Sequence, residues 1–184
     1  MKNLGGKKTI SDMEVGEIDT SLKDYKYQPK LTEKLEGLFE DFTQETINEI
    51  VLWKVNRYSE LNPETLNLLN QISKEDKEIK ADLTKELLRK LLDTPGIRLP
   101  MASTILRFKN PNIYQIIDQR AYRFLYGKDL KNYFSNIDQQ IEYYLEYLTK
   151  LRIKCDEKKI PFEIADQVLY QLDKEKNSGH KIKT

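Results

Sequence analysis

Apolar residues recur every three or four positions along most of the chain from residue 31 to residue 173, which is the period of an amphipathic α-helix. The clearest such face consists of Ile137, Ile141, Tyr144, Leu145, Leu148 and Leu151. The few glycine and proline residues mostly stand between these stretches, where they mark helix ends. Residues 114–117 are mostly apolar and are expected to be extended, but they are too few to form a sheet. The pattern therefore predicts an all-α fold of about seven helices joined by short loops.

The two ends of the chain lack this helical period. Residues 1–30 mix charged, polar and glycine residues and predict a flexible N-terminal arm, while residues 174–184 are polar and predict a disordered tail. Residues 31–173 are then expected to form one compact helical domain, long enough to bury a core. The chain shows no internal repeat, so a solenoid is not expected.

Charged residues make up 33% of the chain, but they nearly cancel, with a formal net charge of +1. This balance argues against a protein that coats nucleic acid indiscriminately. The charges are unevenly spread, however. Residues 32–49 hold six acidic residues and one basic residue, whereas residues 98–131 hold seven basic residues and two acidic ones. The second segment could form a phosphate-binding surface, although it could equally be a set of solvated helix faces.

The chain has one cysteine, Cys155, and one histidine, His180, which lies in the polar tail. A single cysteine excludes an internal disulfide, a four-thiolate zinc site and a cysteine-held iron–sulfur cluster. No metal site is therefore predicted. No apolar run approaches about 20 residues, and the start lacks the hydrophobic block of a signal peptide. We expect a cytoplasmic protein without a membrane segment.

The candidate chemistry begins at a tight turn, Thr94-Pro95-Gly96, between two helical stretches within residues 83–108. Proline and glycine there must end the first helix, and the second starts with small residues that allow the two to cross closely. The backbone N–H groups at the start of the second helix would face outward, where they could bind a phosphate. The alternative is an ordinary helix corner.

The stretch PGIRLPMASTIL resembles the helix–hairpin–helix motif of the HhH-GPD family of DNA glycosylases. Gly96 takes the place of the family's first hairpin glycine, Ile97 that of its central hydrophobe and Ala102 that of its helix alanine. The family also places an aspartate at the start of a later helix, and Asp118 follows Gly96 by 22 residues. Arg123 lies where the family often has an arginine. The resemblance covers residues 91–127.

This resemblance implies an all-α fold of the helix–hairpin–helix DNA glycosylase type and a role in binding DNA. The expected phosphate contacts are Gly96, Ile97, Arg98, Met101 and Arg123. Hairpins of this family can also hold a monovalent cation through backbone carbonyls, but no iron–sulfur cluster is expected. The protein would excise an altered base as a repair enzyme, and we expect a monomer.

The resemblance gives Asp118 the catalytic role. Cleavage of an N-glycosidic bond develops positive charge on the sugar, which a fixed carboxylate stabilises. The amides at a helix start would hold that carboxylate ionised. Pro100 stands where bifunctional members carry a lysine, so a monofunctional hydrolase is expected. Asp118 could also be a plain helix cap. Asp166 could also be proposed as a site acid, but its place among Ala165 and Val168 favours a helix-surface or structural role.

Two further departures concern the hairpin and the base pocket. Arg98 replaces the second hairpin glycine, which would be strained if the backbone there required a positive φ. Trp53 and Asn56 lie on a helix that corresponds loosely to the family's base pocket, although a tryptophan among apolar residues is commonly a core residue. Two alternatives remain open: the protein is a DNA-binding module without catalysis, or it is a helical interaction protein.

Overall fold

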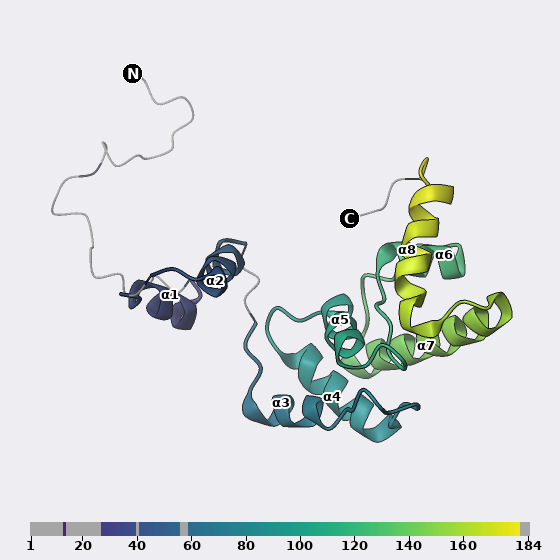
Figure 1. The fold of residues 1–184 in the computed structure, drawn as a ribbon, viewed down its shortest axis with the longest axis horizontal. Helices are drawn as coiled ribbons and strands as arrows, with labels where there is room; N and C mark the ends of the chain where they lie inside the picture. Colours follow the sequence, from purple (N-terminus) through teal and green to yellow (C-terminus); the bar gives the residue numbers. More distant parts are fainter. Residues whose placement is uncertain (1–12, 14–26, 40, 56–58, 181–184) are drawn as a thin grey trace, which may run out of the picture. The chain divides into compact units, whose positions relative to one another are not determined.

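The computed structural model describes residues 13, 27–39, 41–55 and 59–180, and these residues form helices and connecting loops without a strand (Figure 1). The all-α prediction is therefore confirmed for this part of the chain. The elements are α1 (Pro29–Glu36), α2 (Gln44–Lys54), α3 (Pro63–Asn70), α4 (Ala81–Asp93), α5 (Leu99–Lys109), α6 (Gln119–Tyr126), α7 (Ile137–Lys158), a 3₁₀ turn η3 (Phe162–Ile164) and α8 (Ala165–Lys176). Within the described ranges, no helix has both the length and the apolar character needed to cross a membrane.

The chain divides into two compact units, residues 1–58 and residues 59–184. The predicted domain of residues 31–173 thus spans both units. The last helix, α8, extends three residues past the boundary predicted at residue 173. Most of the predicted N-terminal arm and the final residues 181–184 lie outside the described residues.

The first unit contains α1 and α2, which are held together by few buried side chains. Thr43 caps α2 through a hydrogen bond that its side chain accepts from the amide of Thr46. Trp53 donates its indole N–H to the hydroxyl of Thr32 over 2.9 Å. No residue of α2 is fully buried.

The core of the second unit is built from α4, α5 and α7 around the segment 113–117. Leu87, Leu88 and Leu91 supply the buried face of α4. Residues 114–117 form neither a helix nor a strand, and two of their carbonyl groups are bonded to tyrosine hydroxyls of α7. Tyr144 donates to the carbonyl of Gln115 and Tyr147 to that of Ile116. The tyrosine hydroxyls thus provide these carbonyl groups with the hydrogen bonds that a neighbouring strand would provide in a sheet.

The hairpin between α4 and α5 turns at Gly96, whose φ is 85°. The amide of Ile97 donates to the carbonyl of Thr94 over 3.1 Å and closes the turn. Ile97 is buried, so its side chain anchors the turn in the core. The φ of Gly96 lies in the left-handed region that residues with a Cβ atom rarely adopt. The structure therefore explains why glycine stands at this position.

Replacing Gly96 with alanine is expected to lower the free energy of unfolding by about 1–2 kcal/mol. The main cause is backbone strain at the positive φ. The added Cβ would also lie 2.6 Å from the Oγ of Ser59, but this side chain can move, so the steric part is smaller. Chemical denaturation of the two proteins measures the effect. A Ser59→Ala background removes the steric part only, so most of the loss should persist there. A Gly96→Ala variant with an unchanged free energy of unfolding would show that the turn does not need this backbone conformation.

Candidate nucleic-acid interface and carboxylate pocket

The exposed face of the hairpin consists of Gly96, Arg98, Pro100 and Met101. Ile97, a predicted phosphate contact of the hairpin, does not belong to this face, since its side chain is buried and its amide is already bonded within the turn. No side chain caps α5, and the first amides of a helix have no intrahelical partner. The start of α5 therefore presents backbone N–H groups beside the cationic side chain of Arg98.

Arg98 is accommodated without backbone strain. Its φ is −110° and its ψ is 171°, which is extended backbone that any residue adopts. A glycine is therefore not required at this position, although the hairpin of the family has one there. The side chain of Arg98 lies at the surface immediately before the first turn of α5.

Asp118 caps α6, and its Oδ1 atom accepts a hydrogen bond from the amide of Ala121 over 2.7 Å. The cap predicted from the sequence is thus confirmed. The side chain is half-buried and lines a pocket of about 640 Å³. The other residues that line this pocket are Ile116, Asp166, Gln167, Tyr170, Gln171, Lys174 and Glu175. Most of them come from α8, which lies beside α6 (Figure 1).

Burial raises the pKa of Asp118 above its ordinary value of 3.8. The amides of Ala121 and Arg120 donate to the carboxylate and lower the pKa, but burial outweighs them. The negative charge of Asp166 raises the pKa further. The amides at the helix start therefore do not keep the pKa of this carboxylate low, contrary to the expectation from the sequence. A half-buried acid with a raised pKa in a pocket is also a typical feature of a functional site.

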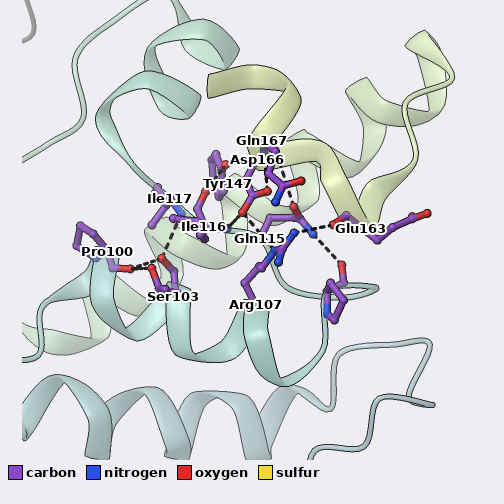
Figure 2. A network of polar contacts seen from close by, with 12 residues as sticks. Pro100, Ser103, Arg107, Gln115, Ile116, Ile117, Tyr147, Glu163, Asp166 and Gln167 are labelled. Atoms are coloured by element: carbon purple, nitrogen blue, oxygen red, sulfur yellow. Dashed lines mark hydrogen bonds and ion pairs between the residues drawn. The ribbon is translucent and has the colours of Figure 1, made fainter. Parts of the chain in front are cut away.

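Asp166 lines the same pocket and is only 4% exposed. Figure 2 shows that its two oxygens accept hydrogen bonds from the backbone: Oδ2 from the amide of Ile116 over 3.1 Å and Oδ1 from that of Gln167 over 2.7 Å. The Nε atom of Arg107 lies 3.6 Å from Oδ2. The structural interpretation of Asp166 is therefore supported. Sequence reasoning missed its proximity to Asp118, because 48 positions separate the two residues and no local pattern links them.

Ser103 connects the hairpin to the segment that carries Asp118. Its buried hydroxyl donates to the carbonyl of Pro100 over 2.8 Å and accepts from the amide of Ile117 over 3.2 Å (Figure 2). The first turn of α5 is thereby joined, through one side chain, to the residue immediately before Asp118. This contact fixes the position of the carboxylate segment relative to the hairpin.

The hairpin and Asp118 nevertheless line different pockets. Arg98 lines a second pocket, of about 450 Å³, together with Leu99, Pro100, Leu130, Lys131, Asn132, Tyr133, Phe134 and Gln140. The two pockets share no lining residue. A phosphate bound at the hairpin and a group bound beside Asp118 would therefore have to belong to one extended ligand.

Arg123 is placed away from the hairpin surface, in an ion pair with the fully buried Asp173 of α8. Its Nη2 and Nε atoms lie 2.7 and 2.9 Å from the carboxylate oxygens, and Nη1 donates to the carbonyl of His180. The side chain is 10% exposed. Because each nitrogen of the guanidinium already has an acceptor, this geometry argues against the predicted phosphate contact and gives Arg123 a structural role.

Trp53 packs within the first unit. Its ring meets that of Tyr27 edge to face at a centroid distance of 4.9 Å, and its N–H is bonded to Thr32. The side chain is thus engaged in packing, but it is half-buried and not a core residue. Asn56, the other predicted pocket residue, lies outside the described residues. The contacts of Trp53 give no support for a base pocket at this residue.

Among the described residues, no three histidine, cysteine, aspartate or glutamate side chains are grouped so that they could hold a metal ion. The comparisons with known proteins add no constraint on the function. The chain matches no protein-family model, no curated protein and no solved structure.

Proposed function

We propose that this protein binds DNA through the hairpin at Gly96 and hydrolyses the N-glycosidic bond of an altered base with the carboxylate of Asp118, in the manner of a monofunctional DNA glycosylase. The observation that carries the proposal is the Ser103 bridge, because it joins the start of α5 directly to the residue before Asp118. A phosphate clamp and a carboxylate that act on one nucleotide need such a fixed relation.

The pocket beside Asp118 has the chemistry that a base requires. Tyr170 is partly exposed and offers a ring for stacking, and the amide side chains of Gln167 and Gln171 can donate to and accept from a base edge. A volume of about 640 Å³ is ample for a base and its sugar. Lys174 lies at the same pocket and can neutralise a phosphate.

A second function is favoured by one observation, the separation of the two pockets. If no nucleotide reaches the pocket of Asp118 while the hairpin holds the DNA backbone, the protein is a binding module without glycosylase activity. In that case Asp118 serves only as the cap of α6. The two functions differ in whether free base is released from bound DNA.

Replacing Arg98 with alanine is expected to weaken the binding of duplex DNA uniformly across sequences and to reduce the slope of log K against log salt by about 1. The cause is the loss of one cation that pairs with a phosphate beside the start of α5. Binding titrations at several salt concentrations measure the slope. The control is Arg152→Ala, because Arg152 lies outside the hairpin. Its guanidinium donates to the carbonyl of Asn112 and stacks over Phe162. An unchanged slope for Arg98→Ala would remove the hairpin from the proposed interface.

The test of the proposal is incubation with duplexes that carry a panel of altered bases, including deaminated, alkylated and oxidised bases. Alkali then breaks the strand at each abasic site, and the fragments are separated by size. Cleavage of at least one duplex, dependent on both protein and alkali, is the expected result. Binding without cleavage of any duplex would favour the module. The absence of binding even at low salt would rule out both functions.

A further inference from the structure

We propose that the pocket between the hairpin and the α6–α7 loop binds an unpaired nucleotide of the DNA strand, so that the protein prefers DNA in which such a nucleotide interrupts a duplex. The inference rests on the proposed binding of DNA by the hairpin, but it does not depend on catalysis by Asp118. It assigns a ligand to the pocket of about 450 Å³ that Arg98 and residues 130–134 line.

An exposed aromatic ring is the first feature of this pocket. Tyr133 is 77% exposed, among the most exposed large hydrophobic side chains of the described residues. It stands in the loop between α6 and α7. An exposed ring beside cations is the usual platform on which an unstacked base lies, because every base has an aromatic face.

Charge is the second feature. Arg98 and Lys131 line the pocket from opposite elements, the hairpin and the loop, and none of the described lining residues is acidic. The amino group of Lys131 also lies 5.0 Å from the centre of the Phe134 ring, which places the cation beside the aromatic surface. Two cations and no carboxylate favour an anionic ligand, and the phosphates on either side of a nucleotide provide it.

Amide groups are the third feature, and they can distinguish a base from a plain phosphate. Asn132 and Gln140 both line the pocket. The Oδ1 atom of Asn132 accepts a hydrogen bond from the side chain of Gln119, which orients the amide and leaves its N–H groups for a ligand. Gln119 also accepts from the amide of Leu130, so this contact fixes the loop against the start of α6. Residues 130–132 of the pocket are therefore held against the start of α6, the helix that Asp118 caps.

The pocket does not suit a base that is paired within a duplex. A base within a duplex is stacked on both faces, so its ring cannot lie on Tyr133 unless the nucleotide leaves the stack. A bulged, flipped or single-stranded nucleotide needs little or no energy to do so. The occupant that suits the ring, the cations and the amides together is thus an unpaired nucleotide next to the phosphates held by the hairpin.

The experiment compares a continuous duplex with the same duplex that carries one extra unpaired 2-aminopurine nucleotide. Affinity is measured by fluorescence anisotropy, and stacking by quenching of 2-aminopurine. The wild-type protein is expected to bind the bulged duplex about tenfold more tightly and to quench its base. Tyr133→Ala should lose both effects and retain its affinity for the continuous duplex, whereas Tyr133→Phe should retain all three.

Phe108→Ala is the matched control, because Phe108 is 67% exposed but does not line the pocket. It should behave as the wild type, and all variants should unfold at the wild-type temperature. Equal affinities of the wild type for the two duplexes, or quenching that survives in Tyr133→Ala, would overturn the inference. A wild type that binds neither duplex would instead overturn the proposed function, on which the inference rests.

Discussion

Replacing Asp173 with alanine is expected to lower the free energy of unfolding by about 3 kcal/mol, the largest stability effect that the structure predicts. The carboxylate is fully buried and pairs with two arginines of α6: Arg123 at 2.7 Å and Arg120 at 3.2 Å. Removing it leaves two guanidinium groups together without a counter-charge. The effect stands at the lower end for buried pairs, because Arg120 keeps 27% of its surface exposed and can be rehydrated.

Urea denaturation of the wild type and Asp173→Ala measures this difference. The matched control is Glu157→Ala on α7, because Glu157 forms an exposed pair with Lys154 and its loss should leave no measurable change. If Asp173→Ala is as stable as the control, the pair between α6 and α8 does not hold the two helices together.

The same residue gives a pH dependence with a defined sign. Hydrogen bonds from Arg123 hold the pKa of Asp173 below its ordinary value of 3.8, although burial opposes them. The contribution of Asp173 is therefore fully present above pH 3.8 and is lost as the pH falls through the lower, folded-state pKa. Below pH 3.8 the stability difference between the wild type and Asp173→Ala should shrink.

Asp118→Asn is expected to reduce the rate of base release by about 10²–10³-fold while leaving the protein at least as stable. Asparagine caps a helix as well as aspartate does, so α6 keeps its N-terminal hydrogen bond. Because burial raises the pKa of Asp118, the ionised carboxylate opposes folding at neutral pH, and the neutral amide removes this penalty. An unchanged or raised unfolding temperature together with a lost rate identifies a functional carboxylate.

Single-turnover rates on the fastest duplex of the panel and thermal unfolding measure the two effects. The rate of the wild type should fall on the acidic side as Asp118 becomes protonated, at a pH above 3.8. The stability advantage of the variant should appear as the pH rises from 3.8 through that raised pKa. An Asp118→Asn variant that releases base at the wild-type rate would leave the residue with the role of a cap alone.

Local features of the sequence predict the helices and some of their caps. Asp118 caps α6, as the sequence allows, and Gly127 ends this helix in the left-handed conformation. The turn at Gly96 can be predicted equally well, since Pro95 and Gly96 are residues that end helices and form turns. These features depend on a few neighbouring residues, so no tertiary information is needed.

The contacts of charged residues could not be predicted in this way. Arg123 follows Asp118 closely enough to suggest a shared site, yet its partner is Asp173, 50 positions away on α8. The presence of Asp166 in the same pocket as Asp118 likewise depends on how α8 packs beside α6. Trp53 stands among apolar residues that suggested a core, but its neighbours on α2 are largely exposed. Each case depends on long-range packing, which the local pattern of a single sequence does not contain.

Arg98 shows why a motif residue has to be examined in its backbone. A glycine at the corresponding place in the hairpin suggested strain, but the extended conformation of Arg98 shows none. The replacement instead adds a cation to the exposed face of the hairpin and to the pocket that Tyr133 lines.

The most direct test of the proposed function is the quantification of free base, by mass spectrometry, after incubation of the protein with each altered duplex. We expect one altered base to be released in an amount equal to the abasic sites revealed by alkali, with the strand intact until alkali is added. DNA that is bound tightly while no base is released from any duplex would contradict the account.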